Sequence, residues 1–128
     1  MTHWGKWFFV FVGKYTRKVQ RGGWLRFPKD WLPMVGDKRM IYVMLRPDKG
    51  KSLLLITQDD VDRAVERIRG MEWSEETKKL VLTLGICMEQ VKISADGRMQ
   101  ISTSFLAYAG IKNEAHFWGN AKTIILTN

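Results

Sequence analysis

Two similar stretches of sequence lie about 74 residues apart, at 20–36 and 94–110. Each begins with a glycine-containing turn, continues into a short strand-like segment, and ends with a short apolar segment closed by a glycine. An internal repeat indicates two copies of one supersecondary unit that share a core. We therefore expect the fold to be built as a pair of related units.

The length and composition predict one compact domain. A chain of 128 residues with 45% hydrophobic residues buries roughly two thirds of the surface that its unfolded form exposes. The single cysteine, Cys87, lies in an apolar run, which favours a buried structural thiol in a reducing compartment. The apolar run 7–12 is shorter than a signal-peptide core or a membrane span. These features predict a soluble, cytoplasmic protein that does not enter a membrane.

The positive charge is concentrated in the first half of the chain. Residues 1–58 carry twelve Lys or Arg against three acids, whereas residues 59–128 carry nine against ten. From Lys14 to Lys29 the cations have no intervening carboxylate. Such a segment presents a positive field to a polyanion. Nucleic acid is the favoured partner, and an acidic protein, a membrane surface or a solvated basic face are the alternatives.

The first copy predicts two strands, a short helix and a hairpin. The strands are expected at 8–15 and 25–27, joined by a hairpin turn at Gly22-Gly23. Pro28 then starts a short helix with Trp31 and Leu32 facing inward, and Gly36 ends it. A hairpin of strands 40–45 and 51–57 follows, with its turn at 47–50.

The second copy repeats this order. Its turn is expected at 95–97, its helix from 102 or 103 to 109, and its strands at 115–118 and 123–126.

Two amphipathic helices are expected between the copies. The apolar stripe of the first is Val61, Ala64, Val65 and Ile68, with Asp59 or Asp60 as its cap. The second begins after Ser74 and carries the stripe Thr77, Leu80, Val81 and Leu84. This helical hairpin either links the halves and covers apolar surface or forms an interface between subunits.

The order of these elements resembles the MraZ family, bacterial regulators built from two SpoVT/AbrB-like units. The segments that carry the resemblance are 11–15, 25–28 and 53–56 in the first half and 96–98, 108–111 and 119–126 in the second. The resemblance implies an α+β, mainly β fold, a pseudo-twofold pair of AbrB-type, swapped-hairpin-like β units with an inserted two-helix hairpin. The units would span 1–58 and 86–128, with the hairpin at 59–85, in one compact domain.

The chain departs from the family at its Asp-x-x-Gly-Arg signature. In the first copy these positions are Gln20, Gly23 and Trp24, and in the second copy the aspartate position is Ser94 while the arginine is Arg98. By resemblance, the first-copy arginine helps contact DNA. An indole donates one hydrogen bond and carries no charge, so Trp24 cannot replace a bidentate guanidinium contact.

The resemblance implies a transcriptional regulator that binds promoter repeats of the division and cell-wall gene cluster in double-stranded DNA. MraZ-like proteins assemble as homo-oligomeric rings, and this one would be associated with the nucleoid. The expected DNA contacts are Lys14, Arg17, Lys18, Arg21 and Arg26. The first four would neutralise phosphates, whereas Arg21 or Arg26 would reach a base edge.

Two other functions stay open. One is an MraZ-like scaffold that has lost or altered DNA recognition and acts through protein partners, as the replacement at Trp24 suggests. The other is a single-stranded nucleic-acid binder, because Trp4, Trp7, Trp24 and Trp31 are interleaved with cations.

Catalytic and cofactor motifs are not found in the sequence. His3 and His116 have no ligand-spaced Cys, Asp or Glu around them. Gly22-Gly23 lacks the ending of a phosphate loop, and the serines near 102–104 lack a base. We therefore expect no enzymatic activity, no metal, no cofactor and no small-molecule substrate.

Overall fold

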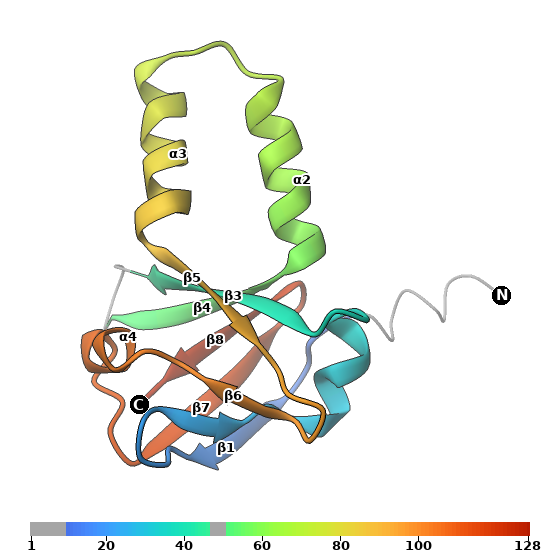
Figure 1. The fold of residues 1–128 in the computed structure, drawn as a ribbon, viewed down its shortest axis with the longest axis vertical. Helices are drawn as coiled ribbons and strands as arrows, with labels where there is room; N and C mark the ends of the chain where they lie inside the picture. Colours follow the sequence, from blue (N-terminus) through green and yellow to red (C-terminus); the bar gives the residue numbers. More distant parts are fainter. Residues whose placement is uncertain (1–9, 47–50) are drawn as a thin grey trace, which may run out of the picture.

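The computed structural model describes residues 10–46 and 51–128 and shows an antiparallel β structure with a projecting helical hairpin (Figure 1). Six strands form one sheet in the order β1-β7-β8-β4-β3-β5, and β2 and β6 form a separate two-stranded ribbon. The strands are β1 (Lys14–Lys18), β2 (Trp24–Arg26), β3 (Met40–Arg46), β4 (Ser52–Thr57), β5 (Met88–Lys92), β6 (Arg98–Gln100), β7 (Glu114–Asn120) and β8 (Thr123–Thr127). The helical segments are η1 (Lys29–Met34), α2 (Gln58–Arg69), α3 (Glu75–Ile86) and α4 (Thr103–Tyr108). The expected α+β, mainly β class is confirmed.

The sequence repeat is also a structural repeat. β1 begins at Lys14 and β5 at Met88, 74 residues later, and the same spacing relates β2 to β6, η1 to α4 and β3 to β7. The strand register follows the same relation, since Lys14 is opposite Trp118 in β7 and Met88 is opposite Met44 in β3. The two copies are therefore related by an approximate twofold axis.

The two copies exchange strands. β1 of the first copy pairs with β7 of the second, β5 of the second pairs with β3 of the first, and β4 pairs with β8 between them. Each copy thus supplies an edge strand for the hairpin of the other. The backbone hydrogen bonds of β1 and β5 are satisfied only by the other half of the chain, which is where a buried ladder needs its partners.

The hairpin expected at Gly22-Gly23 is wrong. The strand there is not 8–15 but β1, and β1 pairs with β7 while β2 pairs with β6. Before β1, the described residues contain only an isolated bridge from Phe11 to Ala121, and residues 8 and 9 lie outside the described part. The two glycines instead close a tight loop in which the amide of Gln20 donates to the carbonyl of Trp24 at 2.7 Å.

The core lies between the sheet and the layer formed by the ribbon, η1 and α4. Trp31 of η1 is buried, as expected, and its ring makes edge-to-face contacts with four aromatic neighbours: Phe11, Tyr15, Phe27 and Phe117. Its Nε1 donates to the carbonyl of Val12 at 3.1 Å. Edge-to-face pairs add to the gain from burial, so this cluster ties η1 to both halves of the sheet.

The helical hairpin of α2 and α3 extends away from the sheet (Figure 1). Thr57 caps α2, where its Oγ1 accepts from the amide of Asp60 at 3.3 Å; the expected aspartate cap is wrong because the helix begins one or two residues earlier. Ser74 accepts from the amide of Thr77 at 3.2 Å at the start of α3, as expected. Among the described residues, no helix combines the length and apolarity required to cross a membrane.

The apolar stripe expected on the second helix is divided between burial and exposure. Thr77 is buried, whereas Leu80, Val81 and Leu82 are exposed. Cys87, expected to be buried, is half-buried. The hairpin therefore presents apolar surface that this chain alone does not cover.

Candidate nucleic-acid interface

The β2–β6 ribbon separates an apolar face from a polar one. Leu25 lies opposite Met99, and both side chains are buried in the core. Because side chains alternate along a strand, the neighbours of this pair face outward. They are Trp24 opposite Gln100 and Arg26 opposite Arg98. We call these four residues the ribbon face.

Within the ribbon face, the arginine that the second copy keeps stacks on the residue that replaces it in the first. The guanidinium carbon of Arg98 lies 4.9 Å from the centroid of the Trp24 ring. Trp24 and Arg98 occupy equivalent positions of the two copies, 74 residues apart. An arginine over an indole face is attracted by the ring quadrupole, so Trp24 holds the retained guanidinium in place.

Turns on either side anchor the ribbon face. Arg26 Nη1 donates to the carbonyl of Asp96 at 2.9 Å, and Gln100 Nε2 donates to the carbonyl of Gly22 at 2.9 Å. Ser94 Oγ accepts from the amide of Arg98 at 3.0 Å. Ser94, which stands at the family's aspartate position, thus closes the turn before β6.

The Asp96 carboxylate is held in its charged form by its neighbours. A hydrogen bond from the Ser94 hydroxyl is the largest cause that lowers the pKa of Asp96 below 3.8, and the charges of Arg98 and Arg26 add to it. The side chain is solvent-exposed, so the two arginines are screened by water as much as by this carboxylate.

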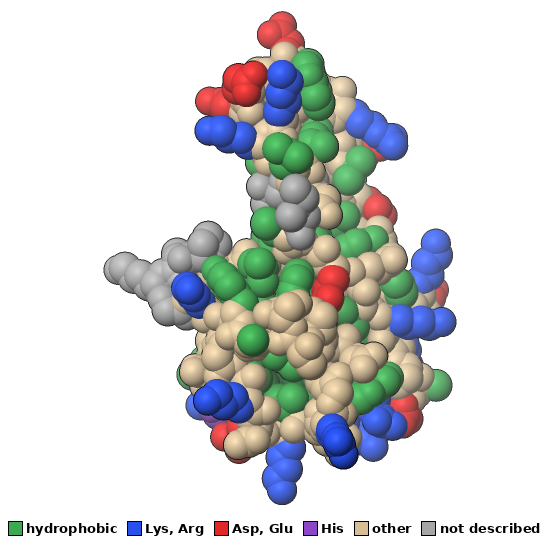
Figure 2. Space-filling model, turned by 60° about the vertical axis from the view of Figure 1, so that its left-hand side comes forward, with side chains coloured by type: hydrophobic (Ala, Val, Ile, Leu, Met, Phe, Trp, Pro, Cys, Tyr) green, Lys and Arg blue, Asp and Glu red, His purple; other side chains and the backbone are tan. Residues whose placement is uncertain are grey.

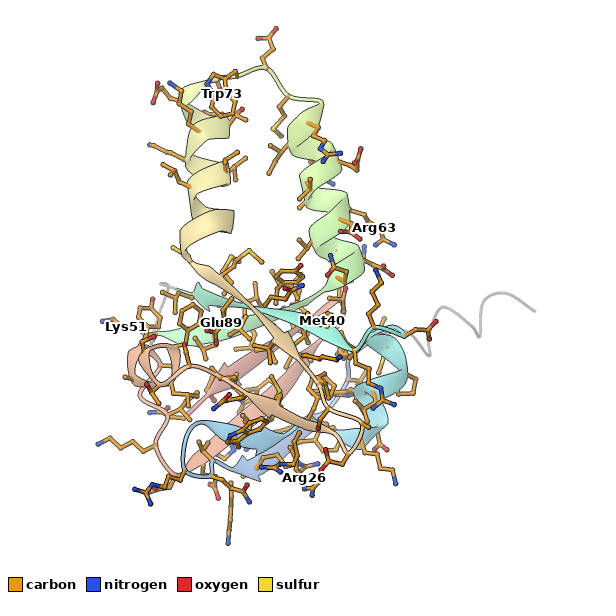
Figure 3. All side chains as sticks on the ribbon, viewed as in Figure 1. Arg26, Met40, Lys51, Arg63, Trp73 and Glu89 are labelled. Carbon is orange, nitrogen blue, oxygen red and sulfur yellow. The ribbon has the colours of Figure 1, made fainter. Side chains whose placement is uncertain are left out.

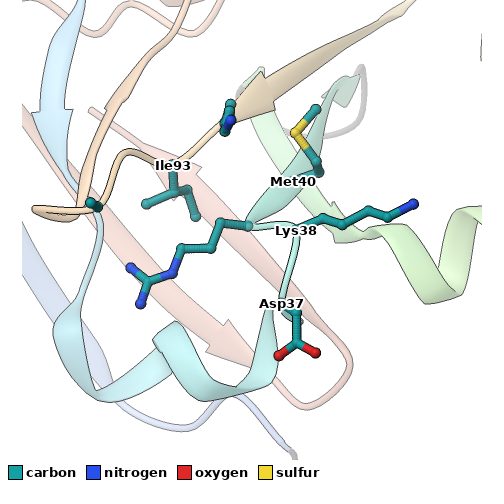
Figure 4. Close-up of a pocket in the computed structure, with 7 residues that line it drawn as sticks. Asp37, Lys38, Met40 and Ile93 are labelled. Atoms are coloured by element: carbon teal, nitrogen blue, oxygen red, sulfur yellow. The ribbon is translucent and has the colours of Figure 1, made fainter.

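A basic pocket adjoins the ribbon face. It is a hollow of about 480 Å³ lined by the cations Arg17, Arg26, Lys29 and Arg39 and by Asp96. A second hollow of about 660 Å³ shares Arg39 and Ala95 with it and adds Asp37, Lys38 and Lys92 (Figure 4). The two hollows are therefore adjacent, and cations outnumber carboxylates in both. A concave surface with this excess concentrates anions.

The five residues expected to contact DNA fall into three places. Arg17 and Arg26 line the basic pocket. Arg21 lines another hollow, with Lys112 and α4. Lys14 and Lys18 alternate with Arg17 along β1 and lie on the opposite face of that strand. There, Lys14 Nζ lies 4.5 Å from the ring centroid of Trp118.

Three further cations belong to the site without having been expected there. Arg98 could have been found from the repeat, because its position pairs with Trp24. Lys29 continues the basic run of the first half. Arg39 gives no signal in the sequence, since it reaches the pocket from the loop between η1 and β3.

The ribbon end of the molecule lies away from the hairpin tip. Figure 3 shows Arg26 at the end opposite Trp73, and in Figure 2 Lys and Arg surround the lower part of the face shown. Among the described residues, no carboxylate forms an ion pair with the five expected contacts; the ion pairs seen lie on α2, on α3 and at His116. The described residues also contain no group of three His, Cys, Asp or Glu suited to a metal.

No protein-family model matches the chain, and no curated protein matches it.

Proposed function

We propose that this protein is a sequence-specific DNA-binding transcriptional regulator of the MraZ type. The observation that carries the proposal is the ribbon face, where Arg26 and Arg98 lie side by side across two antiparallel strands. A two-stranded ribbon fits the major groove of B-DNA, and arginine pairs with the O6 and N7 atoms of guanine. The ribbon face would read bases, and the cations beside it would hold phosphates.

The repeat and the exchanged strands support the finer description of the fold. The symmetric pairing of β1 with β7 and of β5 with β3 is the arrangement expected of two swapped-hairpin, AbrB-type units. In that arrangement the ribbon joins equivalent strands of the two copies, so their recognition residues meet at one surface.

Trp24 changes the recognition in this proposal but does not remove it. Since the indole carries no charge, the first copy cannot supply the family's arginine. Stacking on Arg98 restricts the motion of that guanidinium, and a preorganised group loses less conformational entropy on binding. One ordered arginine from the second copy, with Arg26, would then do the reading.

A second copy of the chain is the proposed occupant of the exposed apolar surface. On the outer face of the sheet, apolar side chains form a row across five strands: Trp118, Ile125, Leu54, Met44 and Met88. Leu82 of α3 is 58% exposed, and Figure 2 shows hydrophobic side chains where the hairpin meets the body. A homo-oligomeric ring would cover this surface and present many ribbon faces to repeated sites, which raises the overall affinity.

In this proposal the protein acts in the cytoplasm at the nucleoid, without catalysis, metal or cofactor. The scaffold alternative is favoured by one observation, the 68% exposure of Trp73 at the hairpin tip. A large exposed indole is typical of a contact with another protein.

A gel-shift titration tests the proposal. Promoter duplex, random duplex and single strand are each titrated at two salt concentrations, with wild type, R26A/R98A and the control K112A/K122A, which removes the same charge elsewhere. We expect tight promoter binding that R26A/R98A abolishes and the control retains. Equal loss in both variants would mean that only net charge matters. Preference for single strand would favour the stacking alternative, and binding to none would favour the scaffold.

Native mass spectrometry of the same variants measures the oligomer. R26A/R98A should leave its size unchanged, because the ribbon face and the apolar row lie on different surfaces. A change in size would mean that the loss of DNA binding arises from loss of assembly.

A further inference from the structure

We infer that the basic pocket is a binding site for a compact phosphorylated anion with at least two negative charges, such as a diphosphate group. The site is distinct from the ribbon face, with which it shares only Arg26. It would make the protein responsive to a small phosphorylated molecule, in addition to the DNA binding proposed above.

The charge balance of the pocket is the first argument. Arg17, Arg26, Lys29 and Arg39 line it against a single carboxylate, Asp96. That carboxylate already accepts from the Ser94 hydroxyl, and among the described residues it forms no ion pair with any of the four cations. Four like charges gathered around one hollow repel each other, and a multivalent anion between them removes that repulsion.

Arg39 supplies the second argument. Its Nη1 is inaccessible to solvent and has no hydrogen-bond partner among the described residues. Buried donors in proteins are nearly always paired, and an unpaired one calls for a partner such as a bound ion. The guanidinium that lines the pocket therefore has an unused donor.

The backbone of Arg39 is strained as well. Its φ is 52°, a left-handed conformation that costs free energy for any residue other than glycine. Its carbonyl accepts from the amide of Ile93 at 2.8 Å, and its amide donates to the carbonyl of Gly36 at 3.2 Å. Strain of this kind is retained where the surrounding structure imposes it, often at binding sites. Here it directs a cation toward the pocket.

The repeat provides an internal comparison. The equivalent hollow of the other copy is lined by Thr103 where this pocket has Lys29, and by Asn113 where it has Arg39. Both hollows measure about 480 Å³. The twofold-related site thus keeps the size and loses the charge, so the cations are not a consequence of the fold.

Phosphate is the ligand chemistry that fits. Arginine presents a fork of donors that matches the oxygens of a phosphate group, and such charge-assisted bonds are the strongest that proteins make. A hollow of about 480 Å³ accommodates more than one phosphate group. The groups could belong to a free small molecule or to a nucleic-acid backbone, and the experiment distinguishes these sources.

Isothermal titration of the full chain with inorganic pyrophosphate tests the inference. The variant K29T/R39N converts the pocket into its counterpart, and asparagine tolerates the left-handed backbone at residue 39. The control K112T/K122T removes the same charge elsewhere. We expect saturable binding by wild type and control, and a loss of about tenfold or more in K29T/R39N. Circular dichroism checks folding, and the single variant K29T, at an exposed position, should weaken binding in the same direction.

Two results would overturn the inference: no saturable binding of pyrophosphate by wild type, or equal weakening in K29T/R39N and the control. Competition identifies the source of the phosphate. If promoter duplex displaces pyrophosphate, backbone phosphates enter the pocket; if both bind together, the pocket takes a free anion. Duplex binding without pyrophosphate binding would reject this site alone, whereas the reverse would reject the DNA proposal alone.

Discussion

Arg98 lies with its guanidinium carbon 4.9 Å from the ring centroid of Trp24, and these two residues are equivalents in the two copies of the repeat. The departure from the family signature in the first copy is therefore compensated locally, since the new aromatic ring packs on the retained arginine. This pair explains why a tryptophan is compatible with an arginine-based reading surface.

Loss of the indole should weaken duplex binding through Arg98. A cation–π contact at an exposed site contributes about 0.5–1 kcal/mol, so we expect W24A to lower duplex affinity about two- to fivefold. W24F keeps a ring and should stay within about twofold of wild type. Fluorescence anisotropy at fixed salt measures all three proteins. Equal affinities of W24A and wild type would show that the stack does not serve binding.

Binding to duplex should depend steeply on salt. Each neutralised phosphate adds about 0.9 to the slope of log affinity against log salt. We expect R17A to reduce that slope by about one unit, with K122A as a control that leaves it unchanged. A salt-independent signal would contradict phosphate neutralisation altogether.

Two adjacent glycines should respond differently to alanine. Gly22 and Gly23 both have positive φ, 87° and 86°, which costs a non-glycine residue roughly 1–2 kcal/mol. A Cβ on Gly22 would meet nothing nearer than 3.5 Å, whereas one on Gly23 would overlap the carbonyl oxygen of Ile101. We expect G23A to be destabilised by about 1–3 kcal/mol more than G22A. Urea unfolding of both variants makes the comparison, and equal midpoints would mean that the turn shifts freely.

The pKa of Asp96 should rise when Ser94 is removed. Its hydrogen bond is the largest cause of the lowered pKa, so S94A should move the value back toward 3.8. The sign of the linkage follows: a depressed carboxyl pKa stabilises the fold above pH 3.8, and this stabilisation is lost as the pH falls through the folded value. Carboxyl-carbon NMR titration measures both proteins. An unchanged pKa in S94A would assign the shift to Arg98 and Arg26.

The start of α2 should depend on the Thr57 hydroxyl. Its Oγ1 accepts from the amide of Asp60 at 3.3 Å, and loss of such a cap costs about 0.5–2 kcal/mol. T57A should be destabilised by this amount, and T57S, which keeps the hydroxyl, by much less. Thermal unfolding followed by circular dichroism compares the two. If T57S unfolds like T57A, the methyl group and not the cap is responsible.

Local patterns predicted most of the elements. The glycine stops, Pro28 and the apolar spacing placed η1, α2, α3, α4 and the two later hairpins close to their observed bounds, because these features act over a few residues. The strand expected at 8–15 was misplaced, since apolar character there reflects the packing of Phe11 against Trp31 and not a continuous ladder.

The repeat and the charge distribution are properties of the sequence alone, and they established that two related units share one core with the cations in the first. Which strands pair was decided by the tertiary structure, because β1 and β5 find partners in the other copy, far along the chain. The same exchange brings Arg98 beside Arg26 and onto Trp24, and places Arg39 and Arg17 around one hollow. No local preference encodes these meetings, since each arises only when the separate halves close into a single sheet.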